Sequence, residues 1–324
     1  MDITRNDYGS VNVTEVDKLV ITVITDNYYD ALRPDAAITQ RFRTQPGQWM
    51  HAEHGLSFFI EASSSGRTSG FMFDYGLDAQ GVHKNMDVLG IDMGKAVGFG
   101  LSHGHFDHWT GLTQLLTMNR SKIQKGVPLY VGEGAFERRY SFVPGTSNRL
   151  DIGRLSKSGI EALGLVSVVE VKKPTEVMPG GYFSGNVERV TEYEKVPPYL
   201  LVQKGETVVV DTFPGEQAMV FHVRDKGLVI VSGCAHAGIV NTVKHIKKIT
   251  GIDKVHAVIG GFHLVNAQQE IIQRTIADLK TINSDWVVPA HCTGFEATKA
   301  FSEAMPDRFI LNTAGTKYTF GACA

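Results

Sequence analysis

The sequence has few cysteines, almost no net charge and no long apolar run. Three cysteines in 324 residues are an odd number, which argues against a disulfide framework and favours a reducing compartment. The 32 Lys and Arg balance 34 Asp and Glu, giving a net charge of −2, so recognition of nucleic acid through a basic face is not expected. Apolar runs such as residues 18–24 fall short of the ~18–20 residues of a membrane span, and residues 1–10 lack the pattern of a secretory signal. We therefore expect a soluble, cytoplasmic protein with no membrane partner.

Hydrophobic residues make up 43% of the chain, which is too many for a disordered protein. At about 150 residues per domain the length suggests two domains, although single α/β domains are often larger. The motifs described below are spread over nearly the whole chain and favour one domain over residues 1–324. The unusual feature of the composition is histidine, with 12 residues, several of which follow apolar runs.

Short β-rich segments alternate with helical patterns along the chain. Strands are predicted at residues 19–24, 57–60, 71–73, 97–101, 127–131, 207–210, 228–231, 257–259 and 286–288. The turn cluster at residues 63–66 predicts that two of these strands form a hairpin. Apolar residues at helical spacing predict helices near residues 112–116, 239–249 and 272–279, the second closed by Gly251 and the third capped by Asn266. This order predicts an α/β fold in which two mixed sheets form a sandwich with helices outside.

The segment 138–198 is predicted to be irregular because it holds several Pro-Gly and Pro-Pro pairs. We interpret it as an insertion or lid within the domain, since long irregular segments of compact domains are often functional; a surface excursion without a role is the alternative. Its aromatic residues could stack a flat ring or could be ordinary core and surface residues. They are Tyr182, Phe183, Tyr193 and Tyr199.

The strongest functional signal is the segment Ser102-His103-Gly104-His105-Phe106-Asp107-His108. It directly follows an apolar strand. Alternation along an extended chain places His103 and His105 on one side, where two imidazoles can hold one metal ion. Asp107 and His108 follow at the turn into the next helix and can face a second ion. Imidazole and carboxylate ligands suit Zn, and also Fe or Mn.

Three more histidines each follow a predicted strand of the carboxyl-terminal third. They are His236, His263 and His291. Ligands of α/β proteins gather beyond the carboxyl ends of strands. Any one of these residues alone would be interpreted as a structural histidine, but together with the first cluster they predict a shared site.

The pattern His103-x-His105-x-Asp107-His108 resembles the signature of the metallo-β-lactamase superfamily. Segments 52–57, 232–241, 260–264 and 289–294 resemble, within it, the branch of dihydropterin-ribofuranosylaminobenzene-phosphate synthases. The resemblance covers most of the chain. It implies an αββα sandwich with one or two metal ions at the edge of the sheets.

The same resemblance implies a division of the ligands. His103, His105 and His236 are expected to hold one metal, and Asp107, His108 and His291 the other. His236 is the natural substitute for a histidine that the superfamily commonly has after a Pro-Gly turn, because this chain has Glu216 after that turn. Cys234 stands where the superfamily commonly has an aspartate. Glu216 could supply a carboxylate to the site or could be a salt-bridged surface residue.

Other residues are predicted to surround the metals. His263 is expected to face the substrate and to act as an acid toward the leaving group, with a ligand role as the alternative. Glu53 and His54 could line the same pocket, or form a surface pair. Asp211 could orient a ligand histidine. Two cysteines flank ligand candidates and could bind a soft metal, or could simply be small buried residues; they are Cys234 and Cys292.

Three functions are compatible with these residues. The first is a metal-dependent hydrolase, in which a metal-activated hydroxide, oriented by Asp107, attacks an ester, phosphoester or related bond of a small molecule. The second is a transferase that condenses a dihydropterin with a ribosylated aromatic amine phosphate and uses the metal as a Lewis acid. The third is a non-catalytic protein that binds a metal or a ligand. All three need a divalent cation, expected to be Zn, Fe or Mn, with one or two ions per chain.

Overall fold

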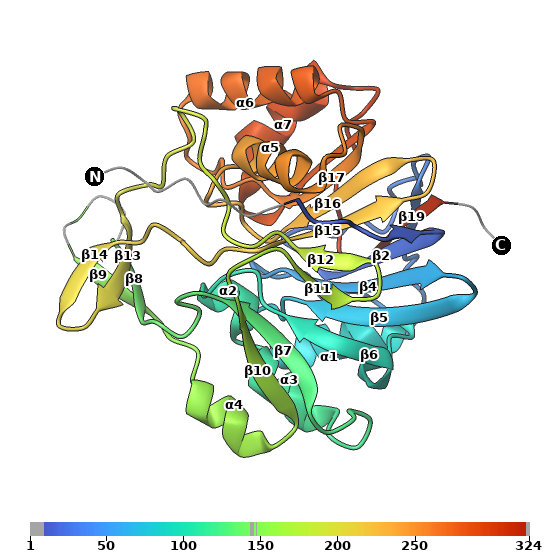
Figure 1. Cartoon of the computed structure of the whole chain (residues 1–324). Coiled ribbons are helices and arrows are strands. Elements are labelled where there is room, and N and C mark those ends of the chain that lie inside the picture. The colour runs from blue at the N-terminus through green and yellow to red at the C-terminus, as the bar shows by residue number, and fades with distance from the viewer. Residues whose placement is uncertain (1–9, 143–145, 147, 322–324) are drawn as a thin grey trace.

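The computed structural model describes residues 10–142, 146 and 148–321. Residues 1–9, where no secretory signal is expected, lie outside the described residues. Two mixed β-sheets pack face to face, and helices cover the outer face of each (Figure 1). The predicted αββα sandwich is therefore confirmed.

The first sheet has eight strands in the order β10-β7-β6-β5-β4-β2-β19-β3. Their bounds are Lys18–Thr25 (β2), Thr39–Arg41 (β3), Ser57–Ser64 (β4), Arg67–Phe73 (β5), Ala96–Gly100 (β6), Val127–Gly132 (β7), Val166–Val171 (β10) and Thr316–Gly321 (β19). Strands β4 and β5 form the predicted antiparallel hairpin, in which Ser64 pairs with Arg67. Strands β5, β6, β7 and β10 run parallel.

The second sheet has the order β11-β12-β15-β16-β17-β18, and β1 also pairs with β15. The bounds are Glu15–Val16 (β1), Thr175–Met178 (β11), Gly181–Phe183 (β12), Ala218–Val223 (β15), Gly227–Ser232 (β16), Val255–Gly261 (β17) and Trp286–Ala290 (β18). Strands β16, β17 and β18 are parallel neighbours. Their carboxyl ends therefore lie at one edge, and each leads into one of the three predicted histidines.

Three hydrophobic clusters separate the layers of the sandwich. One lies between the sheets and includes Phe58, Phe183 and Phe221. A second packs α1 (Ala79–Leu89), α3 (Leu112–Met118) and α4 (Lys157–Leu163) on the first sheet. The third packs α5 (Ile239–Thr250), α6 (Gln269–Ile282) and α7 (Phe295–Ala304) on the second sheet. Short helical turns complete the fold, at Met93–Lys95 (η1), Phe106–Trp109 (α2) and His291–Thr293 (η2). Within the described residues, no helix is both long enough and apolar enough to cross a membrane.

The two predicted helix ends have different outcomes. Gly251 closes α5 in the left-handed conformation, with φ at 68°, as predicted. Asn266 does not cap α6, because that helix begins at Gln269 after Gln268. Asn266 instead lies in the preceding turn, where its φ of 59° is one that asparagine tolerates better than most residues.

The segment 138–198 is more regular than the sequence predicts. Strand β10 belongs to the first sheet, and β11 and β12 belong to the second. Strands β8 and β9 belong to a third, four-stranded sheet, with the order β14-β13-β8-β9. Its strands are Arg139–Phe142 (β8), Arg149–Gly153 (β9), Leu200–Lys204 (β13) and Thr207–Val210 (β14). The strands within this segment have three to six residues. Runs this short give a weak strand pattern, so the Pro-Gly and Pro-Pro pairs between them dominate the prediction.

Candidate metal centre

The loop after β6 holds four of the predicted donor residues. His103 and His105 precede helix α2, and His105 occupies the N-cap with extended backbone. Asp107 and His108 lie on α2 itself, and all four residues are buried. The carbonyl of His108 accepts a hydrogen bond from the peptide N–H of Tyr75 (2.8 Å). This bond ties the loop to the end of β5, so the donors are held by the first sheet.

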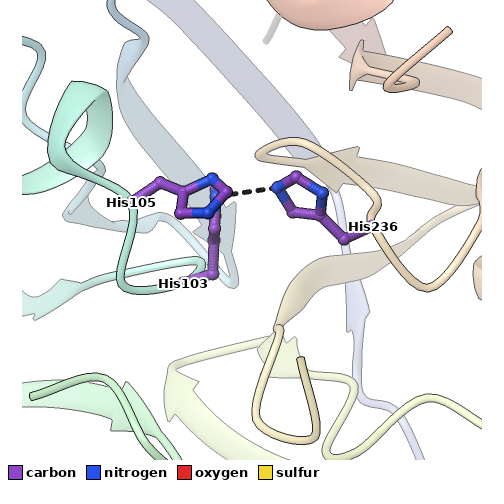
Figure 2. Close-up of side chains that lie close together, drawn as sticks. All are labelled: His103, His105 and His236. Atoms are coloured by element: carbon purple, nitrogen blue, oxygen red, sulfur yellow. Dashed lines mark hydrogen bonds between the residues drawn. The ribbon is translucent and has the colours of Figure 1, made fainter. Parts of the chain in front are cut away.

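His103, His105 and His236 form the first donor group. One ring nitrogen from each lies within 4.8 Å of those of the other two. The Nε2 atoms of His103 and His236 are 3.2 Å apart. Figure 2 shows the two histidines of the loop facing His236, which comes from the turn after β16. The structure thus brings together the three residues predicted to share one metal.

Asp107 is the centre of the second donor group. Its Oδ2 lies 3.1 Å from Nε2 of His291 and 3.9 Å from Nε2 of His108. His54 joins this group, with Nε2 3.6 Å from the same oxygen and its ring stacked on that of His291 at 4.9 Å. The side chain of His54 is 61% exposed. It therefore approaches the donors from the solvent side, whereas His108 and His291 approach from within the fold.

Asp74 orients two of the ligand candidates, and the sequence interpretation missed it. Its Oδ2 accepts hydrogen bonds from Nδ1 of His108 (2.6 Å) and Oγ of Ser102 (2.7 Å). Ser102 Oγ in turn lies 2.9 Å from Nδ1 of His103. Both imidazoles are thereby turned so that Nε2 faces the site, an arrangement that fixes the tautomer of metal-binding histidines. Asp74 directly follows strand β5, so the rule that revealed the histidines could also have found it.

His291 is held by two further residues that the sequence interpretation missed. Its Nδ1 lies 3.2 Å from Oδ1 of Asn27, and its peptide N–H donates to Oδ1 of Asp26 (3.0 Å). Burial raises the pKa of Asp26 above its usual value. Asp26 and Asn27 follow the end of β2, again at the carboxyl end of a strand.

Glu216 supports the site from behind and is not a surface residue. It is 4% exposed, and burial raises its pKa above the usual value. Its two carboxylate oxygens accept the peptide N–H groups of His236 and Ala237, both at 2.7 Å. With both oxygens engaged in this way, Glu216 fixes the turn that carries His236.

Two predicted roles are wrong. Asp211 does not orient a ligand histidine, because its Oδ2 accepts a hydrogen bond from Nε of Arg139 (2.7 Å) and its Oδ1 one from the peptide N–H of Phe213 (2.8 Å). Glu53 does not line the donor groups. Its carboxylate accepts the peptide N–H groups of Leu77 and Asp78, both at 2.8 Å, and so holds the turn before helix α1.

Cys234, Cys292 and His263 complete the cluster. Cys234 Sγ is 3.2 Å from Nε2 of His108, and both cysteines are buried. The ring of His263 lies 4.1 Å from that of His236. Both ring nitrogens of His263 are buried without a hydrogen-bond partner within the described part of the chain. Its φ of 44° lies in a region that non-glycine residues seldom adopt.

The charges of the site follow from burial and from the paired groups. Burial lowers the pKa of His103, His105 and His236 well below the usual value, so these rings are neutral and their nitrogens can act as ligands. Burial opposes ionisation of Asp107, but His108 and His291 outweigh it and hold the pKa of Asp107 well below its usual value. Burial also lowers the pKa of His291, but the hydrogen bond with Asp107 outweighs it and raises that pKa to about 9.

These residues fit a divalent cation. His236 presents Nε2 to another imidazole nitrogen, and its Nδ1 is buried without a partner among the described residues. Clustered neutral imidazoles with no acceptor between them would each leave a buried polar atom unsatisfied. A shared cation resolves that cost, and imidazole, carboxylate and thiol donors suit Zn or Fe.

A cavity of about 320 Å³ adjoins the first donor group at His236. Its wall includes His236, His263 and Tyr199. Two of the four aromatic residues proposed for ring stacking line it, Tyr193 and Tyr199, together with Pro197 and Pro198. The other two do not, because Tyr182 and Phe183 are buried in the hydrophobic clusters of the sandwich.

Comparison with known proteins places this site in a family. No protein-family model matches the sequence. A protein of Methanocaldococcus jannaschii named 7,8-dihydropterin-6-methyl-4-(beta-D-ribofuranosyl)-aminobenzene-5'-phosphate synthase is 34% identical, over 94% of this chain and 98% of that protein. A second protein of the same organism, Uncharacterized protein MJ0448, is 26% identical over 82% of this chain and 92% of its own length.

The solved structures show the same architecture. Tm1679, described as a metal-dependent hydrolase of the β-lactamase superfamily, superposes with a TM-score of 0.72 at 23% identity. The match covers 94% of this chain and 100% of that one. At this identity the likeness establishes the fold, while the relative from M. jannaschii establishes the family. The chain has the metallo-β-lactamase fold and belongs to the family of the 7,8-dihydropterin-6-methyl-4-(beta-D-ribofuranosyl)-aminobenzene-5'-phosphate synthase.

Proposed function

We propose that this protein is a metal-dependent transferase that joins a dihydropterin, activated at its 6-methyl carbon, to a ribosylated aminobenzene phosphate. The observation that carries the proposal is the 34% identity to the named synthase over nearly the full length of both chains. In the reaction a C–N bond forms to the methyl carbon, the bond to the leaving group breaks, and the amine loses a proton.

The cavity beside His236 supports this substrate class. A bicyclic heterocycle is flat and needs a pocket with apolar or aromatic walls and a few polar groups. Tyr199 and Pro197 supply apolar walls, and the rings of His236 and His263 line the same cavity. Tyr193 is fixed from outside, because its hydroxyl donates to Asp278 (2.7 Å) and the guanidinium of Arg274 lies over its ring.

The segment 190–199, which carries Tyr193 and Tyr199, is anchored on helix α5. The carboxylate of Glu194 accepts the peptide N–H groups of Val240 and Asn241, both at 2.8 Å. The side-chain oxygen of Asn241 in turn accepts the peptide N–H groups of Val190 and Thr191. The cavity wall is therefore held in place before a substrate enters, which reduces the entropy lost on binding.

The donor groups would hold the cation with His103, His105 and His236 on one side and Asp107, His108 and His291 on the other. A divalent cation bound there supplies Lewis acidity that stabilises negative charge developing on a departing oxygen. In this proposal the imidazole of His263, which lines the cavity beside His236, donates a proton to that oxygen. The proposal assigns acceptance of the amine's proton to the carboxylate of Asp107, whose pKa His108 and His291 hold low.

A hydrolase is the second candidate, and one observation favours it. His54 and Asp107 meet at the solvent side of the donors, 3.6 Å apart. An ionised carboxylate beside the exposed ring of His54 can accept a proton from an entering water. The predicted substrate would then be an ester or phosphoester of a small molecule.

One assay separates the two candidates. Metal-loaded protein is supplied with the activated dihydropterin alone, with the amine alone, with both, and with a panel of chromogenic esters and phosphodiesters. The transferase predicts a coupled product by mass spectrometry only when both substrates are present. Turnover of the ester panel without coupled product would support the hydrolase instead. If the metal-loaded protein turned over no substrate under any of these conditions, the result would support a non-catalytic metal-binding protein.

Variants assign the activity to the site. We expect His103→Ala and Asp107→Ala to abolish turnover. The matched control is His83→Ala, which removes a histidine that pairs with Asp87 on helix α1, away from both donor groups.

A further inference from the structure

We propose that the thiolate of Cys234 is a metal ligand shared between the two donor groups. This inference rests on the metal-dependent function proposed above. The sulfur lies near both donor groups: it falls within 4.8 Å of one ligand atom each of His103 and His108, of His236 and His263, and of His291 and Cys292.

The distances are those expected of ligands that share an ion. Cys234 Sγ is 3.2 Å from Nε2 of His108, and donors bound to one tetrahedral zinc at about 2.0–2.3 Å lie roughly 3.5 Å apart. Asp74 holds Nδ1 of His108 at 2.6 Å. The Nε2 atom of His108 is therefore directed toward the sulfur and cannot turn away without breaking a buried bond.

The backbone around Cys234 is built to bring the sulfur into this position. Cys234 is 2% exposed, and the next residue, Ala235, has a φ of 54°, a conformation that costs free energy in a non-glycine residue. Glu216 holds the two following peptide N–H groups. Glycines make the close approach possible: a Cβ at Gly233 would clash with Ser102, and one at Gly261 would lie 2.6 Å from Sγ of Cys292.

No described carboxylate competes with the sulfur for this position. Asp107 is the one carboxylate within the groups of potential ligands, and it already faces His291. Both oxygens of Glu216 are engaged with the backbone. Among the described residues, the sulfur of Cys234 is therefore the anionic donor that lies beside both groups.

Cys292 has a different role in this arrangement. Its sulfur belongs to a single group of potential ligands, and its thiol is directed at the carbonyl of Cys234 (3.5 Å). We assign it as a packing neighbour of the ligand. It also provides a matched control, since it is a buried cysteine at nearly the same place.

Thiolate ligation has a consequence for metal choice. The thiol of Cys234 loses its proton to solvent when a cation binds, because a coordinating thiol is deprotonated outright. Soft thiolate ligands favour Zn, Fe and Co over Mn and Mg. The site should accordingly bind Zn²⁺ or Co²⁺ and discriminate against Mg²⁺.

Cobalt substitution tests the assignment without reference to catalysis. All proteins carry Cys323→Ser, so that Cys234 and Cys292 are the two remaining cysteines. Metal-free protein is titrated with Co²⁺, and the near-ultraviolet thiolate-to-cobalt charge-transfer band is recorded with the bound metal content. We expect the band in the parent and in Cys292→Ser. We expect no band in Cys234→Ser and Cys234→Asp, with Co²⁺ affinity at least about tenfold weaker in Cys234→Ser. A band that persists in Cys234→Ser, or that disappears in Cys292→Ser instead, overturns the proposal.

A measurement on the unsubstituted protein does not depend on the folding of any variant. X-ray absorption at the zinc edge of the zinc-loaded protein should show sulfur at about 2.3 Å in addition to nitrogen or oxygen at about 2.0–2.1 Å. A shell of nitrogen and oxygen alone contradicts thiolate ligation and leaves the metal-dependent function intact. A protein that binds no metal at all contradicts both.

Discussion

The carboxylate of Asp74 and the imidazole of His108 form a fully buried hydrogen bond, with Oδ2 and Nδ1 2.6 Å apart. The bond joins the end of β5 to helix α2 and turns Nε2 of His108 toward the donors. Burial lowers the pKa of His108, but the charges of Asp74 and Asp107 outweigh it and raise that pKa above the usual value. The orientation of His108 in the candidate metal centre therefore depends on a residue that lies outside both donor groups.

Asp74→Asn should weaken metal binding without removing a ligand. Residues that hold the far nitrogen of a metal-binding histidine typically contribute 10–100-fold to affinity, so we expect a loss of about that size in competition titrations with a chelator. The amide side chain of this variant cannot accept all three hydrogen bonds that Ser102 and His108 donate to the carboxylate. Unchanged affinity in a folded variant would show that Asp74 is structural only.

Asp211→Ala should destabilise the fold by about 3–5 kcal/mol, because it leaves the buried guanidinium of Arg139 without its partner. Arg139 also donates to the carbonyl of Gly104 in the donor loop (3.4 Å). The double replacement Arg139→Met with Asp211→Leu removes both charges and should recover most of that loss. Urea unfolding of the metal-free proteins measures both effects. A double variant as unstable as the single one would contradict this account of the pair.

Tyr199→Ala should raise KM for the dihydropterin about tenfold, because it removes an aromatic wall of the cavity. Tyr199→Phe keeps the ring and should stay near the wild-type value. Steady-state kinetics with the amine held at saturation give both constants. If the two variants change KM equally, the hydroxyl and not the ring of Tyr199 is what the substrate meets.

The metal-free protein should be most stable near neutral pH. The pKa values of His103, His105 and His236 are lowered by burial, while these residues titrate near about 6.5 in the unfolded chain. Below that pH the unfolded chain binds more protons, so the free energy of unfolding decreases as pH falls. His291 acts in the opposite sense, because its pKa of about 9 gives stability that is present below about 6.5 and lost as pH rises through 9.

Replacement of single histidines separates the two parts of the pH profile, the loss of unfolding free energy at acid pH (the acid limb) and the loss at alkaline pH (the alkaline limb). His236→Asn should flatten the acid limb of the urea-unfolding profile, and His291→Asn should flatten the alkaline limb. An acid limb with the wild-type slope in His236→Asn would show that the buried imidazoles are not its cause.

The sandwich could be predicted from the sequence because its strands and helices have strong local patterns. Strand β2, for example, is rich in β-branched residues, and helix α5 carries apolar residues at helical spacing. The short strands β8 to β12 could not be predicted in this way. Their positions depend on pairing with distant strands, as β10 pairs with β7 and β12 with β15, and no local pattern reports such pairing.

The donor residues of the site could be located because the histidines follow strand ends. What the sequence could not reveal is which polar group faces which. Asp211 and Glu53 occupy strand ends or turns near motifs, yet they bind Arg139 and backbone N–H groups. Asp74 looks equally ordinary and holds His108. The choice is made by tertiary packing, which fixes the direction of each side chain.

Metal titration of the metal-free protein, with product formation measured at each step, tests the central claim most directly. The account predicts no coupled product without metal, and a rate that rises in proportion to bound Zn²⁺ or Fe²⁺ until one or two ions per chain are bound. It predicts that His103→Ala neither binds metal tightly nor forms product. Product formation at the full rate by metal-free protein, or tight binding and normal turnover in His103→Ala, would contradict it.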